Sequence, residues 1–173
     1  MEESGTPSDA SALIYLAKAG ALTVAAEYLG PLLIPPAVWR EAVESGEQRG
    51  SPDAAVIRMA VDPGVVKPVR LHAAQSQRAI RLARVFGLGA GESEVLAMGA
   101  QRDVVLLDEH RATRAARHLG ILCIETIVLP GLCAQAGVLD RARALALLDE
   151  LARHTIIPTD SWVRARALIL EAK

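Results

Sequence analysis

The clearest strand signal in the chain is Val104-Val105-Leu106-Leu107-Asp108, in which four apolar residues run directly into a carboxylate. A fully apolar run of this length predicts a strand that is buried on both faces, as in a parallel sheet covered by helices. The apolar runs at 32–34 and 121–124 are further strand candidates, and 65–69 is a weaker one whose proline suggests an edge position. Between them, apolar residues recur every three or four positions, which predicts helices at 10–19, 36–45, 52–61, 71–85, 92–101, 109–119, 138–153 and 161–172. This alternation of strands and helices favours an α/β fold.

Composition limits the classes of function. The chain has 173 residues, 51% of them hydrophobic and 23% charged, which is typical of one globular domain. A net charge of −1 excludes a uniformly basic nucleic-acid coat, and 3% aromatic residues exclude exposed rings as the main means of binding bases. Cys123 and Cys133 fit neither a disulfide framework nor a paired zinc spacing. We therefore expect a protein of a reducing compartment, the cytoplasm, with no membrane segment.

Four carboxylates stand where strands are predicted to give way to helices. Asp108 directly follows the strand at 104–107, Asp9 precedes the first helix, Glu41 lies one turn into the helix after 32–34, and Glu92 opens a helix after Gly87-Leu88-Gly89-Ala90-Gly91. Ligands of open parallel sheets bind beyond the carboxyl ends of the strands, so all four could meet at one edge. Each also has a structural explanation, because Asp is a common N-cap and Glu is favoured in the first turn of a helix.

Four blocks, taken in order, resemble a known family. They are Ser8-Asp9-Ala10-Ser11-Ala12-Leu13-Ile14-Tyr15-Leu16-Ala17, Ile34-Pro35-Pro36-Ala37-Val38-Trp39-Arg40-Glu41, Gly91-Glu92-Ser93-Glu94-Val95-Leu96-Ala97 and Leu106-Leu107-Asp108-Glu109. No single block is specific, but the ordered set is similar to PIN-domain nucleases. It most resembles the bacterial and archaeal subgroup of toxin-like proteins that are described as predicted nucleic-acid-binding PIN proteins.

The resemblance implies a three-layer α/β/α domain with a short parallel sheet of strand order 3-2-1-4-5. It also implies a metal-dependent ribonuclease, an endonuclease that hydrolyses phosphodiester bonds, in a family where many members are the toxin of a toxin–antitoxin pair. Carried over position by position, the catalytic set is Asp9, Glu41, Glu92 and Asp108, with Ser11 beside the first acid. Asp9, Glu92 and Asp108 are then the expected metal ligands. We expect a PIN-like catalytic domain at 1–137 and a helical extension at 138–173 packed on it.

The residue types agree with this chemistry. Carboxylate oxygens suit Mg²⁺ or Mn²⁺ rather than zinc, and a divalent cation relieves the repulsion among clustered acids. A bound ion can lower the pKa of a water to make a nucleophile, and a second ion can stabilise the leaving oxygen.

Basic residues stand apart from the acids. Residues 63–91 contain no acid, and Arg78, Arg81 and Arg84 recur every third position there. These arginines, with Arg111, are candidates for contacts to a phosphate backbone, although a solvated basic helix face explains the first three equally well. The expected partners are single-stranded RNA, a small antitoxin protein and a second copy of the chain in a homodimer. The alternative function is a non-catalytic PIN module that binds nucleic acid or a partner protein.

The start of the chain departs from the pattern of buried strands. Residues 1–8 contain no β-branched aliphatic residue. We nevertheless expect residues 5–8 to run extended beside 104–107. Without a strand at this central position of the sheet, the strands on either side would have unpaired backbone N–H and C=O groups.

Overall fold

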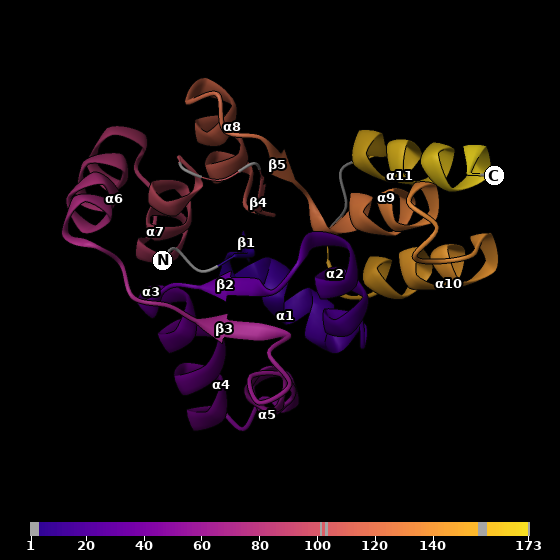
Figure 1. The fold of residues 1–173 in the computed structure, drawn as a ribbon, viewed down its shortest axis with the longest axis horizontal. Coiled ribbons are helices and arrows are strands. Elements are labelled where there is room, and N and C mark those ends of the chain that lie inside the picture. The colour runs from indigo at the N-terminus through magenta and orange to yellow at the C-terminus, as the bar shows by residue number, and fades with distance from the viewer. Residues whose placement is uncertain (1–3, 101, 103, 156–158, 173) are drawn as a thin grey trace.

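The computed structural model of the protein describes residues 4–100, 102, 104–155 and 159–172 (Figure 1). Its strands are β1 (Thr6–Pro7), β2 (Leu32–Ile34), β3 (Val66–Pro68), β4 (Val105–Leu106) and β5 (Cys123–Ile124). Its α-helices are α1 (Ala10–Lys18), α2 (Leu22–Leu29), α3 (Pro36–Trp39), α4 (Ser45–Gln48), α5 (Pro52–Met59), α6 (Ala73–Phe86), α7 (Ala90–Gly99), α8 (His110–His118), α9 (Leu129–Gln135), α10 (Arg141–Ala152) and α11 (Thr159–Glu171). A π-helical segment, η1 (Arg40–Glu44), joins α3 to α4, and a 3₁₀ segment, η2 (Thr126–Val128), precedes α9.

All strand pairs are parallel, which confirms the predicted fold class. The strand order differs slightly from the predicted continuous order of five. β1, β2 and β3 form one ladder with β2 in the middle, while β4 and β5 form another. A single bridge from Ser8 to Leu106 and the hydrogen bond from Asp9 N–H to Leu106 O (3.1 Å) connect β1 to β4. The ladder is brief here because the chain leaves the strand at Asp9 to begin α1.

The polar first strand forms, but it pairs with β2 and meets residues 104–107 only through the bridge from Ser8 to Leu106. Thr6 and Pro7 are buried and pair with Leu32 and Leu33, and Ser8 is also buried. Thr6 Oγ1 donates to Leu29 O (2.7 Å), so its hydroxyl is satisfied inside the protein. Main-chain pairing and one side-chain hydrogen bond therefore replace the apolar side chains that a central strand usually carries.

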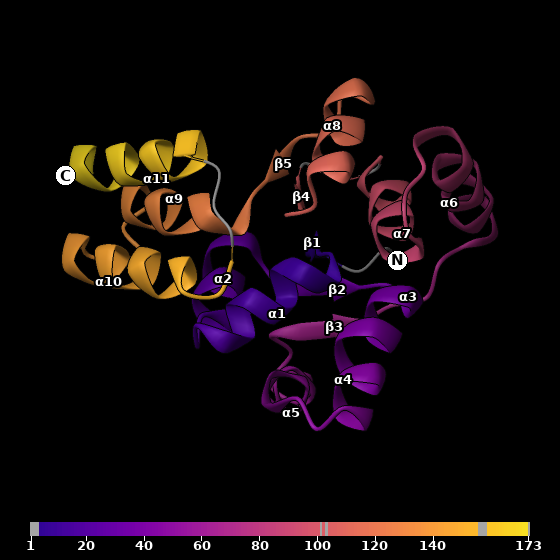
Figure 2. The ribbon, with the colours of Figure 1, turned by 180° about the vertical axis from the view of Figure 1, so that it is seen from behind.

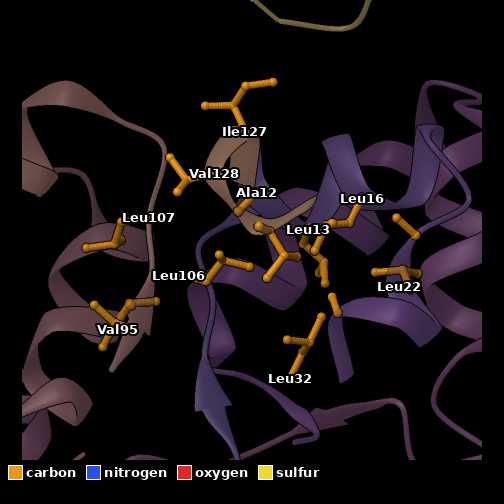
Figure 3. Packing of buried hydrophobic residues seen from close by; sticks show 14 of the residues in the cluster. Ala12, Leu13, Leu16, Leu22, Leu32, Val95, Leu106, Leu107, Ile127 and Val128 are labelled. Carbon is orange, nitrogen blue, oxygen red and sulfur yellow. The ribbon is translucent and has the colours of Figure 1, made fainter. Parts of the chain in front are cut away.

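Helices lie on both sides of the strands (Figures 1 and 2). Successive side chains at the end of β4 point to opposite faces of the sheet, and each face is covered by a helix. Leu106 points toward Leu13 of α1, while Leu107 lies beside Val95 of α7 (Figure 3). All four of these side chains are fully buried. One continuous apolar core thus packs α1 against one face and α7 against the other.

The C-terminal helices α9, α10 and α11 pack on one another at one end of the molecule (Figure 2). Sequence reasoning missed α9, because Pro130-Gly131 is a pair that usually interrupts a helix; the structure places this proline in the first turn, where a missing N–H costs nothing. Gly131 allows α9 and α11 to approach closely, since a Cβ there would lie 2.7 Å from Leu168 Cβ.

Helix α2 was also not predicted, and the last residue of the helix expected at 92–101 lies outside the described residues. Among the described residues no helix is both long and apolar enough to cross a bilayer.

Candidate active site

Asp9 links the sheet to the first helix. Its Oδ1 accepts the N–H of Ala12 (2.8 Å) and so caps α1, and its Oδ2 accepts the N–H of Asp108 (3.1 Å) at the end of β4. The residue is only 2% exposed. Two backbone donors from elements far apart in the sequence therefore fix the orientation of this carboxylate.

Asp108 lies directly beyond β4 and beside Asp9. Its Oδ1 accepts the N–H of Thr126 (2.7 Å), while its buried Oδ2 has no hydrogen-bond partner among the described residues. The interpretation of Asp108 as a helix cap is wrong, because Glu109 caps α8 instead, through Oε2 and the N–H of Ala112 (2.7 Å). The carboxylate of Asp108 is consequently held by the start of η2 and keeps one oxygen uncommitted.

Glu92 stands in the first turn of α7, and the glycines around it explain its position. A Cβ on Gly89 would lie 2.5 Å from Glu92 Oε2, so glycine leaves the space that this carboxylate occupies. A Cβ on Gly91 would lie 3.4 Å from Val38 and 3.6 Å from Glu41 Oε2, which shows how closely α7 approaches the segment carrying Glu41. In the part of the chain that the structure describes, no group hydrogen-bonds to the buried Oε2 of Glu92. The glycine-rich run therefore shapes this edge of the protein rather than cradling a dinucleotide.

Glu41 lies at the rim and is exposed. It belongs to η1, a π-helical insertion of the kind that often occurs at functional sites. Its carboxylate lies near enough to Glu92 to raise that residue's pKa. The structure thus brings Asp9, Asp108, Glu92 and Glu41 to the same edge of the sheet, with the first two in direct contact and Glu41 outermost.

Three further acids border this group. Glu109 raises the pKa of Glu92, and Glu125 raises that of Asp108. Glu94 faces another way, since its Oε2 accepts the N–H of Ala37 (2.8 Å) and holds the start of α3. Of these three, Glu109 and Glu94 lie within the sequence blocks that resemble PIN domains. Glu125 had no sequence signal, because the pairing of β5 with β4 alone brings it here.

Burial dominates the electrostatics of the site. It raises the pKa of Asp9 to about 7, and the nearby charge of Asp108 adds to the effect. Burial also raises the pKa of Asp108 to about 6, against the opposing effect of hydrogen bonds from Thr126. The pKa of Glu92 is raised as well, first by burial and then by Glu109 and Glu41. Negative charge is therefore costly at this site unless a cation compensates it.

The donor set fits a hard divalent cation in its chemistry. It consists of carboxylate oxygens, and two of them, Glu92 Oε2 and Asp108 Oδ2, are buried with no hydrogen-bond partner among residues 4–100, 102, 104–155 and 159–172. Across the part of the chain that the structure describes, no three His, Cys, Asp or Glu side chains already form a group that could hold one ion.

The candidate substrate-binding residues are less closely gathered. A cavity of about 640 Å³ between α6 and α8 is lined by Phe86, His110, Arg111, Arg114 and His118, among others, and its lining includes none of Arg78, Arg81 and Arg84. Arg111 is exposed and donates to Gly87 O (2.9 Å), and Ser11 is partly exposed at the start of α1. Arg81 and Arg84 are exposed on α6, whereas Arg78 is partly buried with an unpartnered Nε. Sequence reasoning missed His110, Arg114 and His118 as cavity residues.

The fold is mixed α/β with parallel strands, and acidic side chains gather at the carboxyl ends of those strands. A family model described as a PIN domain matches residues 7–167. The chain therefore belongs to the PIN-domain family, as the sequence motifs predicted. No curated protein and no solved structure matches it. PIN domains are generally nucleases that interact with nucleic acids and typically use divalent metals.

Proposed function

We propose that this protein is a metal-dependent endoribonuclease that hydrolyses phosphodiester bonds in single-stranded RNA. The observation that supports this most is the meeting of Asp9, Asp108 and Glu92 in a site where the pKa of each is raised. A fold gains no stability from burying carboxylates that resist ionisation. Such an arrangement is instead typical of a functional site.

Asp9, Asp108 and Glu92 are the residues that we assign to a Mg²⁺ or Mn²⁺ ion. When bound, such an ion would supply an activated water and would stabilise charge on the leaving oxygen. Asp9 is fixed by two backbone N–H groups, and Asp108 is fixed by a third. These bonds hold the carboxylates in one geometry, which lowers the cost of positioning them during the reaction.

The residues at the rim have complementary roles in this proposal. Glu41 is exposed and can accept a hydrogen bond from the attacking water, which orients it toward the phosphorus. Arg111 belongs to α8, the helix that Glu109 caps, and its guanidinium can contact the phosphate backbone from there. Ser11, Arg78, Arg81 and Arg84 are further candidates for substrate contacts. The acids would thus act at the scissile phosphate while the arginines hold its neighbours.

The same proposal extends to the biological setting. The toxin-like sequence motifs support a role as the toxin of a toxin–antitoxin pair, with a small antitoxin protein as partner, a homodimeric assembly and a cytoplasmic location. The alternative, a non-catalytic PIN module, differs in one measurable respect, because it would bind nucleic acid without cutting it.

Cleavage of single-stranded RNA by the purified protein tests the proposal. We expect cleavage with Mg²⁺ or Mn²⁺ and none with EDTA. Asp108→Asn should reduce cleavage by more than about 100-fold, because losing even an outer partner of a metal ligand typically costs 10–100-fold. The amide keeps an acceptor for the N–H of Thr126, so the fold should persist. Asp62→Asn is the matched control, since Asp62 is exposed and precedes β3, at the opposite edge of the sheet.

Two results would contradict the proposal. Cleavage by Asp108→Asn at the wild-type rate would remove Asp108 from the mechanism. Binding of RNA without cleavage under any divalent metal would favour the non-catalytic module.

A further inference from the structure

A second cavity opens on the other side of α8 and adjoins the acidic site at Asp108. It has a volume of about 390 Å³, within the range of small-ligand pockets. Its lining includes Thr113, Arg114 and Arg117 of α8 together with Glu125, Asp160 and Ser161. Ile127, which is 4% exposed, contributes an apolar surface. The cavity is therefore neither a phosphate groove nor an apolar pocket, because it combines both signs of charge with an apolar wall.

The charged groups of this cavity do not neutralise one another. In the described part of the chain, neither Arg114 nor Arg117 forms an ion pair within 4.0 Å or a side-chain hydrogen bond. Both are exposed and lie three residues apart on α8, so they share one side of the helix. Glu125 is held in place because Ser161 Oγ donates to its Oε2 (2.8 Å). The cavity thus holds one positioned acceptor, Glu125, and two arginines that form no ion pair with any described residue.

From this juxtaposition we propose that the cavity is a binding subsite for a guanine base beside the scissile phosphate. Guanidinium groups pair in bidentate fashion with two adjacent acceptors, as guanine offers at O6 and N7. A carboxylate accepts from two adjacent donors, as guanine offers at N1–H and its 2-amino group. Guanine is the base that presents both pairs, and single-stranded RNA leaves both edges free to be read. Arg117 and Glu125 are then the specificity-determining residues, since Arg114 also lines the neighbouring cavity.

The inference deepens the proposed ribonuclease function, but its first test does not depend on cleavage. The four nucleoside 5′-monophosphates are titrated separately into the full chain in EDTA, and binding is followed by NMR or calorimetry. We expect guanosine monophosphate to bind at least tenfold more tightly than the other three. Glu125→Gln and Arg117→Ala should each bring the four affinities close together. Ser161→Ala should reduce the preference to a lesser degree, because it frees Glu125 without removing it.

Arg143→Ala is the matched control, since Arg143 is an exposed arginine on α10 and should leave the preference unchanged. Thermal unfolding of each variant checks that the fold is retained. Equal binding of all four nucleotides, absence of guanosine monophosphate binding, or a preference that survives both Glu125→Gln and Arg117→Ala would overturn the inference.

Cleavage then separates the two proposals. RNA oligomers that differ by a single G→A change should be cut at least tenfold more slowly when the replaced guanine adjoins the cut. Cleavage without any base preference would leave the nuclease proposal intact and refute the guanine subsite. Selective nucleotide binding without cleavage of any RNA would do the reverse.

Discussion

The metal-free protein should lose stability as the pH rises from 5 to 8, because Asp9 must ionise while buried. Its pKa is about 7 in the folded protein and 3.8 when exposed. The folded state therefore binds more protons than the unfolded state between about pH 4 and pH 7, so the free energy of unfolding falls as the pH rises through that window. Integrating this difference for one group gives a loss of about 2.5 kcal/mol between pH 5 and pH 8.

Asp9→Asn isolates this contribution. The amide cannot ionise, so the variant should lack the loss of about 2.5 kcal/mol that Asp9 causes. It has only one acceptor oxygen for two donors, the N–H groups of Ala12 and Asp108, so the lost hydrogen bond should lower its stability by about 1–3 kcal/mol relative to the wild type at pH 5. We therefore expect the variant to be less stable than the wild type at pH 5, and at pH 8 to come within about 0.5 kcal/mol of the wild type or to exceed it, because only the wild type loses stability between the two pH values.

Urea unfolding in EDTA, followed by circular dichroism at pH 5, 6, 7 and 8, measures both stability curves. Mg²⁺ should restore stability to the wild type at pH 8 and do less for Asp9→Asn, since a ligand that binds only the folded state stabilises it. The difference between the two proteins is the decisive quantity, because the titration of groups that do not interact with Asp9 cancels in it. A pH-independent difference would refute the reasoning from burial.

Two other predictions concern RNA binding and packing. Changing Arg78, Arg81 and Arg84 together to Ala should make the plot of log RNA affinity against log salt concentration less steep, by roughly 0.7 for each phosphate that an arginine no longer neutralises. Fluorescence anisotropy measures this slope, and an unchanged slope would support a solvated helix face. Gly99→Ala should destabilise the protein by about 1–3 kcal/mol in urea unfolding, because its Cβ would lie 2.6 Å from Val105 Cγ1 and 3.1 Å from Ile121 Cγ2. Gly91→Ala, whose closest neighbour would be 3.4 Å away, is the control in the same helix and should cost less.

The sequence predicted the elements whose signals are local. Apolar runs marked β2 and β4, and the order of motifs predicted the fold and the family. The break between the two ladders could not be predicted, because it depends on where Asp9 leaves the strand to cap α1. Helix α9 was missed because a proline interrupts a helix when it lies in the interior but is favoured when it lies in the first turn.

The candidate site was predicted only as a set of residues. Their approach to one edge follows from parallel strands, but the contacts of each carboxylate do not. Asp108 accepts from Thr126, a residue 18 positions away that β5 brings beside β4. The π-helical turn that carries Glu41 has no local sequence signal. Tertiary pairing sets both features, so reasoning along the chain could not reach them.

Structural and functional explanations of a residue are not exclusive at this site. Asp9 caps α1, as its sequence context indicates, and the same carboxylate accepts from Asp108, 99 residues away, at the edge where the other acids meet. Gly89 begins α7 and also leaves the space that Glu92 occupies. The hydrogen bonds that join β1 to β4 therefore also hold the carboxylates of Asp9 and Asp108 close together, although the two negative charges repel each other. Backbone N–H groups of the fold stabilise these charges. The site must therefore be tested by measuring the free energy of unfolding without metal as well as RNA cleavage with metal.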